Sequence, residues 1–200
     1  MSTYTIPNVI AAHPRGERIM DVYSHLLTER VVYLGTAIDA GVANALVAQL
    51  LFLEADNPDR DIQLYINCEG GDPSAMLGVY DTMRYIRPQI STICVGQAIA
   101  VGAVLLAAGT PGKRAALPHA RIVLHQPAAQ GRGPIPDLIL QADEVVRVRA
   151  DIERILSRHT GQEIARLRAD TDHDRVFTAE NARMYGLVDQ VIEERPPAGG

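Results

Sequence analysis

Short apolar runs alternate with longer amphipathic segments along almost the whole chain. Apolar runs that are bounded by glycine, proline or charged residues predict strands at 31–34, 62–66, 90–95, 121–125 and 188–192. Segments with apolar residues every three or four positions predict helices at 19–28, 39–54, 73–86, 101–109, 137–159 and 178–185. This alternation of strands and helices predicts an α/β domain with crossover connections.

Two of the predicted helices carry long apolar stripes. Asp39 can act as the N-cap of the first, whose stripe is Val42, Leu46, Leu50 and Leu53. The helix at 137–159 would be over 30 Å long at roughly 1.5 Å per residue. Gly161 can close it as a left-handed cap, and its stripe is Leu138, Val145, Ile152 and Leu156. That stripe fits packing against another subunit or against the chain's own sheet.

The chain shows no internal repeat and no linker, so one domain is expected at 19–194. Residues 1–18 are interpreted as an N-terminal segment and residues 195–200 as a C-terminal tail.

Composition narrows the class of protein. The chain of 200 residues is 47% hydrophobic and 22% charged, with a net charge of -5, which argues against a general nucleic-acid binder. The longest apolar run, at 92–108, is interrupted by Gly96, Gln97 and Gly102, so no membrane span is predicted. No signal peptide is apparent, and Cys68 and Cys94 are expected to be reduced thiols. A cytoplasmic protein is therefore expected.

Three features could carry chemistry, and each has a simpler alternative. Gly70-Gly71 follows a predicted strand and could present backbone N–H groups as an oxyanion hole, or be a tight turn. His125 ends an apolar strand, where active sites gather, or is a hydrogen-bonded core residue. Asp174 lies in the charged run 170–175, which also fits a solvated loop. The histidines show no metal-ligand spacing, so no metal site is predicted.

Together, motifs along the chain resemble one family. They are Arg15-Gly16-Glu17-Arg18, Tyr80-Asp81-Thr82-Met83, Gly96-Gln97-Ala98, Leu105-Leu106-Ala107-Ala108-Gly109, Gly112-Lys113-Arg114, His125-Gln126-Pro127, His159-Thr160-Gly161 and Tyr185-Gly186-Leu187-Val188-Asp189. The stretch from Arg15 to Val191 is similar to the ClpP family, the proteolytic subunits of the ATP-dependent Clp protease. The resemblance implies a crotonase-type α/β head with a long handle helix at about 137–159. It also implies two stacked seven-membered rings, Clp AAA+ ATPases as partners, unfolded polypeptides as substrates, and no cofactor.

The family's catalytic triad maps onto Ala100 at the serine position, His125 as the base and Asp174 as the orienting acid. Its oxyanion donors map onto the backbone N–H groups of Gly71 and Val101. Alanine has no nucleophile and no proton to transfer, so the resemblance predicts that this chain is catalytically inactive.

Other positions also depart from the family pattern. Cys68-Glu69 stands where Ser-Pro is usual, Asp72 follows the glycine pair, and Ile99 and Val101 enlarge the residues beside Ala100. We expect the Asp72 carboxylate to lie beside the oxyanion hole and to oppose negative charge there. His173 replaces an arginine associated with ring–ring contacts. These departures favour a naturally inactive ring subunit over an ordinary peptidase with an engineered Ser-to-Ala change. A crotonase-like acyl-CoA enzyme is a remote alternative.

Two departures concern assembly. The family's ATPase-docking pocket maps onto Gln63, Tyr65, Tyr85 and Ala115. The two tyrosines fit, but Gln63 and Ala115 replace larger apolar residues, so we expect weak ATPase docking on this subunit and docking on a partner ring. Pro134 and Pro136 lie in the segment 128–136, where they are expected to alter strand pairing between rings.

Overall fold

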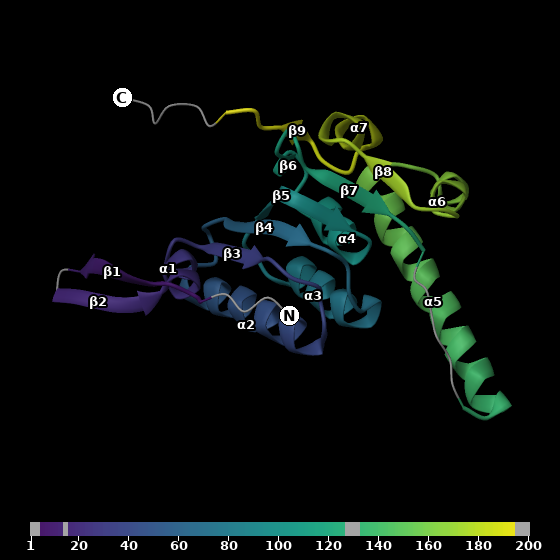
Figure 1. The fold of residues 1–200 in the computed structure, drawn as a ribbon, viewed down its shortest axis with the longest axis horizontal. Coiled ribbons are helices and arrows are strands. Elements are labelled where there is room, and N and C mark those ends of the chain that lie inside the picture. Colours follow the sequence, from purple (N-terminus) through teal and green to yellow (C-terminus); the bar gives the residue numbers. More distant parts are fainter. Residues whose placement is uncertain (1–4, 14–15, 127–132, 195–200) are drawn as a thin grey trace.

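The chain folds into a seven-stranded sheet covered by helices, with a separate two-stranded hairpin near the N-terminus (Figure 1). The computed structural model describes residues 5–13, 16–126 and 133–194. The strands are β1 (Asn8–His13), β2 (Gly16–Asp21), β3 (Val31–Leu34), β4 (Ile62–Cys68), β5 (Ile90–Ile99), β6 (Arg114–Ala116), β7 (Arg121–Leu124), β8 (Arg175–Phe177) and β9 (Gln190–Val191). The helices are α1 (Val22–Thr28), α2 (Ala40–Asp56), α3 (Pro73–Tyr85), α4 (Val101–Ala107), α5 (Ile135–Thr160), α6 (Ile164–Asp170) and α7 (Ala179–Tyr185). The predicted α/β fold is confirmed, and it is consistent with the fold that the resemblance implies.

The sheet is parallel except at one edge, and one strand pairs with two neighbours on the same side. The main strand order is β3-β4-β5-β6-β9. The early part of β5, residues 92–94, pairs with β6, whereas its later part, residues 97–99, pairs with β7. Strand β8 then runs antiparallel to β7. This fork places the carboxyl ends of β5 and β7 next to each other.

The core lies between the sheet and helices α2, α3 and α4. Burial alternates along β4, whose Ile62, Leu64 and Ile66 are buried, as expected for a sheet face that packs against helices. The N-cap role of Asp39 is confirmed, because its carboxylate accepts a hydrogen bond from the Val42 N–H at 2.7 Å. The buried stripe of α2 contains Ala43 in place of Val42, together with Leu46, Leu50 and Leu53.

The long helix α5 has two different halves. It spans 26 residues and ends at Gly161, which has φ 73° and is the predicted left-handed cap. Near its C-terminal end, Val148, Ile152 and Leu156 are buried, and α5 packs against α4 and α6. Its N-terminal half extends away from the sheet (Figure 1) and exposes large apolar side chains: Ile135, Ile139, Leu140 and Val146. The buried half of α5 therefore packs within the chain, against helices rather than directly against the sheet, and packing of the exposed half against another subunit stays a prediction.

The N-terminal region differs from the prediction. The helix predicted from residue 19 begins at Val22, because Asp21 caps it by accepting a hydrogen bond from the Ser24 N–H at 2.9 Å. Residue Ile19 instead pairs with Ile10 in the hairpin. The boundary predicted between residues 18 and 19 thus falls inside β2.

Besides the hairpin strands β1 and β2, three short elements were not predicted: β6, α6 and β8. Strand β8 lies at the end of the charged run 170–175, for which a solvated loop was the simpler alternative interpretation. That interpretation is wrong for part of the run, because Thr171 is buried. The Arg175 guanidinium also lies over the rings of Phe177 and Tyr185, at 5.1 and 5.0 Å from their centroids. The charge of Arg175 is therefore held against aromatic faces.

A buried arginine connects the far end of the sheet to the base of α5. Arg114 Nε donates to Asp189 Oδ2 at 3.0 Å, and its Nη1 donates to the carbonyls of His159 and Gly186 at 2.8 and 3.0 Å. Burial opposes ionisation of Asp189, but the hydrogen bonds from Arg114 outweigh it and lower the pKa of that carboxyl. Three elements are joined through this single side chain.

Within the described ranges, no helix combines the length and apolar content that crossing a membrane requires. Cys68 and Cys94 are free and buried. Burial raises the pKa of the Cys94 thiol to about 11. The predicted reduced state of both cysteines is thus confirmed.

Candidate active site

Four strand ends meet at one edge of the sheet. Strand β4 leads into Gly71, β5 ends just before Ala100, and β7 ends just before His125. Because Leu124 of β7 pairs with Arg175 of β8, the residue before β8, Asp174, comes to lie beside His125. The carboxyl edge of a parallel sheet is where α/β proteins bind ligands. The fold therefore gathers the predicted site residues from segments far apart in the sequence.

Ala100 occupies a strained turn between β5 and α4. Its φ of 50° and ψ of -108° are unusual for a residue with a Cβ. Its N–H donates to the Val123 carbonyl at 2.8 Å, and its own carbonyl accepts from the N–H groups of Ala103 and Val104. A strand that enters a helix through a strained residue is also how α/β hydrolases expose a nucleophile. In this chain the residue in that turn carries only a methyl group.

The glycine pair forms a fixed loop next to this turn. Gly71 has φ 139°, and a Cβ there would lie 2.3 Å from the Ile38 carbonyl oxygen. Ile38 bonds to both flanking residues, through its N–H to the Gly70 carbonyl at 2.9 Å and its carbonyl to the Asp72 N–H at 2.7 Å. This pairing does not use the Gly71 N–H. The Val101 N–H is at the first position of α4, where no intrahelical acceptor exists. Among the described residues, therefore, the surrounding backbone pairing uses neither of the two predicted oxyanion donors.

Asp72 does not act as the sequence suggested. Its Oδ1 accepts hydrogen bonds from the N–H groups of Ser74 and Ala75, at 2.7 and 3.0 Å, so it caps α3. The expectation that the Asp72 carboxylate lies beside the oxyanion hole is therefore wrong, because helix capping holds it elsewhere. The carboxyl-bearing residue that lines the cavity is Glu69.

His125 and Asp174 face each other. His125 Nδ1 lies 3.5 Å from Asp174 Oδ1, which is a loose contact. Asp174 has 72% of its side chain exposed in this single chain, and His125 has 38%. A second link fixes the same two segments, because Gln126 Nε2 donates to Asp172 Oδ1 at 3.1 Å. The two residues are thus close together, and their predicted roles as base and orienting acid stay predictions.

A cavity of about 250 Å³ joins these residues. Ala100, Gly71, Val101 and His125 line it together, and its remaining wall is mostly apolar: Pro73, Val104, Leu124, Ile152 and Leu156. Pockets for drug-sized ligands are larger, about 300–1,000 Å³. The cavity is therefore of a size to hold one side chain of a longer ligand.

Comparisons with known proteins agree on one family. A family model described as Clp protease matches residues 14–195. The chain belongs to the Clp protease family. It is 71% identical over 196 residues to the ATP-dependent Clp protease proteolytic subunit 1 of Nocardia farcinica, covering 98% of this chain and 100% of that protein. It is 59% identical to proteolytic subunit 4 of Rhodococcus jostii, covering 96% of this chain and 99% of that protein. It is 54% identical to proteolytic subunit 2 of Streptomyces avermitilis, covering 98% of both chains.

One structural pair in this Clp-family chain was missed at the sequence level. The Asn67 side-chain oxygen accepts a hydrogen bond from the Gln97 N–H at 3.2 Å, where the pairing of β4 and β5 is irregular. A Cβ at Gly96 would lie 2.5 Å from that same oxygen. Glycine at 96 therefore makes room for the Asn67 amide. The Gly96-Gln97 motif was visible in the sequence, but Asn67, whose side chain it accommodates, lies 30 residues before Gln97.

The four residues assigned to ATPase docking lie in different layers. Gln63 and Tyr65 share one face of β4, and the Tyr65 hydroxyl donates to Gln63 Oε1 at 3.2 Å. Ala115 lies level with Tyr65 across the sheet, because Tyr65 of β4 pairs with Ile93 of β5 and Ile93 pairs with Ala115 of β6. Ala115 is buried. Tyr85 lies at the end of α3 and is 81% exposed. Their docking role stays a prediction.

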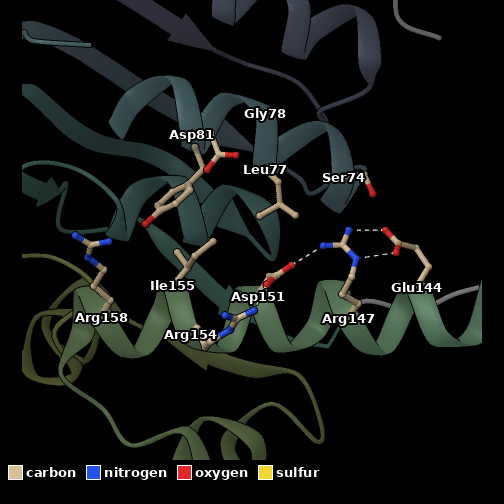
Figure 2. Close-up of a pocket in the computed structure, with 11 residues that line it drawn as sticks. Ser74, Leu77, Gly78, Asp81, Glu144, Arg147, Asp151, Arg154, Ile155 and Arg158 are labelled. Carbon is tan, nitrogen blue, oxygen red and sulfur yellow. Dashed lines mark hydrogen bonds and ion pairs between the residues drawn. The ribbon is translucent and has the colours of Figure 1, made fainter. Parts of the chain in front are cut away.

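A larger groove of about 650 Å³ lies between α3 and α5 (Figure 2). Leu77 from α3 and Ile155 from α5 point into it, and charged side chains of α5 form its other wall. Arg147 bonds Glu144 at 2.6 Å and Asp151 at 2.9 Å. All three residues belong to α5, so these charges are paired within the helix itself. The groove is separate from the cavity that contains Ala100 and His125.

The segment 128–136 falls partly outside the described residues. Within the described part, Pro134 is the N-cap of α5 and Pro136 lies in its first turn, where proline is tolerated. The predicted effect of these prolines on pairing between rings stays a prediction.

Proposed function

We propose that this chain is a ring subunit of an ATP-dependent Clp protease that degrades unfolded polypeptides, and that its own site is catalytically silent. The observation that carries the proposal is Ala100. It stands in the strained turn at the head of α4, lines one cavity together with His125, Gly71 and Val101, and has a methyl group as its side chain.

The chemistry of a serine triad supports the proposal that this site is silent. In a serine triad, histidine takes the proton of the serine hydroxyl as the oxygen attacks the peptide carbonyl, and aspartate orients the imidazole. Here His125 and Asp174 can supply the last two roles. Nothing at position 100 can attack a carbonyl, and loss of the nucleophile lowers turnover by about 10⁶ in such enzymes. We therefore expect binding of peptides without cleavage.

The proposed role is structural or regulatory. Exposed Ile135, Ile139, Leu140 and Val146 on α5 support association of two rings through their handles. We propose stacked seven-membered rings, formed with copies of this chain or with active ClpP-like subunits. Residues 1–18 would form an axial segment, residues 195–200 a tail, and a cytoplasmic Clp ATPase would dock on the partner ring.

The decisive experiment restores the serine. Ala100→Ser is assayed on a fluorogenic peptide, alone and co-expressed with an active ClpP paralogue, and light scattering reports the size of the assembly. We expect no hydrolysis by the natural chain and measurable hydrolysis by Ala100→Ser, which disappears again in Ala100→Ser/His125→Ala. Hydrolysis by the natural chain would refute the silent site, and a monomer under all conditions would refute the ring role.

The alternative is an ordinary peptidase with an engineered change at position 100. Its test is the genomic codon for residue 100. A serine codon there would favour the alternative, and an alanine codon the proposed natural subunit.

A further inference from the structure

The cavity beside Ala100 carries one acidic group at an otherwise apolar wall. Glu69 lines it together with Pro73, Val104, Leu124, Ile152 and Leu156. The Glu69 side chain is exposed, and it forms no hydrogen bond or ion pair with another described residue. No arginine or lysine is among the residues that line this cavity. Its negative charge is therefore available to a ligand.

The backbone holds Glu69 in this place. Strand β4 ends at Cys68, and the Cys68 thiol lies 3.2 Å from the Gly70 carbonyl. On the other side, Ile38 pairs with Gly70 and Asp72. Glu69 lies between these two anchored positions, so its side chain starts from a fixed point at the rim of the cavity.

The neighbouring carboxylate is already used. Asp72 caps α3 through Ser74 and Ala75, whereas Glu69 is not part of a helix cap. The two acids follow the same strand within four residues, but only Glu69 is left to meet a bound molecule. A cation that approaches it would gain a charge-assisted hydrogen bond.

We propose that Glu69 makes this cavity selective for peptide segments in which a lysine or arginine stands next to an apolar side chain. The apolar side chain would fill the cavity between Leu124 and Ile152, and the cation would pair with Glu69 at the rim. The inference rests on the proposed function, because it takes the cavity to be a peptide site. It assigns to this subunit a preference among unfolded chains, which it would hold without cutting them.

The test measures binding, so that it does not depend on catalysis. Two fluorescein-labelled hexapeptides, both with amidated C-termini and the same central leucine, differ only in having lysine or glutamate beside it. Fluorescence anisotropy on the full-length assembled protein gives their dissociation constants at 50 mM and 500 mM salt. We expect the lysine peptide to bind about fivefold more tightly at low salt, with a smaller ratio at high salt.

Three variants decide the result. Glu69→Gln should bring the two dissociation constants within about twofold of each other, and Glu69→Lys should reverse the preference. Glu163→Gln, an exposed acid at the start of α6, should keep the wild-type ratio. Equal binding by the natural chain, a preference that survives Glu69→Gln, or no binding of either peptide would overturn the inference. The proposed function is judged separately, by ring size and by the activity of Ala100→Ser.

Discussion

The N–H of Ala100 donates a hydrogen bond to the carbonyl of Val123 at 2.8 Å, two residues before His125. Residue 100 is therefore attached directly to the strand that leads into His125. This bond depends only on the backbone, so it is unaffected by the identity of the side chain at position 100. A serine placed there would start from the same anchored Cα beside the same cavity.

The backbone strain at Ala100 predicts that glycine stabilises the chain. Because φ is 50° at this residue, Ala100→Gly should raise the free energy of unfolding by about 1 kcal/mol. Ala103→Gly, inside α4 with ordinary helical geometry, is the control and should lower it by about 1 kcal/mol. Chemical denaturation followed by circular dichroism measures both. If Ala100→Gly were as destabilising as the control, the turn would not be strained.

The contact of His125 with Asp174 predicts which further substitutions abolish or reduce peptide hydrolysis in the Ala100→Ser variant. In the Ala100→Ser background, His125→Gln should return peptide hydrolysis to the level of the natural chain. Asp174→Asn should lower kcat by about 10²- to 10⁴-fold, because the imidazole loses its orienting acid. Steady-state kinetics on a fluorogenic peptide measure the effect. His119→Gln, an exposed histidine outside the cavity, is the control, and an equal loss of activity in it would argue against a specific role for His125.

The buried contact of Arg114 with Asp189 predicts a large loss of stability when one partner is removed. Arg114 is 7% exposed and bonds four separate groups of the chain. Arg114→Met should lower the free energy of unfolding by about 3–5 kcal/mol, since Asp189 loses its charged partner and three carbonyls lose their donor. Arg183→Met is the control, because Arg183 pairs with Glu180 on the surface and its loss should cost less than about 1 kcal/mol. Similar midpoints for the two variants in guanidinium would contradict this account.

His159, at the base of α5, predicts a dependence of stability on pH. Its Nε2 lies 3.1 Å from the Tyr80 hydroxyl. Burial, followed by the charges of Arg84, Arg114 and Arg158, lowers the pKa of His159 to about 4. Between pH 6.5 and about 4 the unfolded chain therefore binds a proton that the folded chain does not. The contribution of His159 is present above pH 6.5 and is lost as the pH falls toward 4.

The measurement is a series of guanidinium unfolding midpoints from pH 8 to pH 4.5. His159→Gln should lose less stability over this range than the natural chain does, because the titrating group is gone. His119→Gln controls for the removal of one histidine. A His159→Gln curve parallel to that of the natural chain would show that another group carries the pH dependence.

Local patterns in the sequence determined most of the elements. The Asp39 cap, the Gly161 cap and the apolar run of β4 each depend on contacts within a few residues, so they could be predicted directly. The absence of a hydroxyl at position 100 is likewise a property of the sequence alone. The family motifs added the expected roles of His125 and Asp174, which the structure places side by side.

The tertiary structure decided which of these residues lie next to one another. Only the pairing of β5 with both β6 and β7 brings Ala100 next to His125, and only capping of α3 turns Asp72 away and leaves Glu69 at the cavity. Strands β6 and β8 are three residues each, too short to have a periodicity of their own. They form because neighbours far along the chain supply their hydrogen bonds and cover their side chains. Such contacts join positions far apart in sequence, and no local pattern of hydrophobic and polar residues records them.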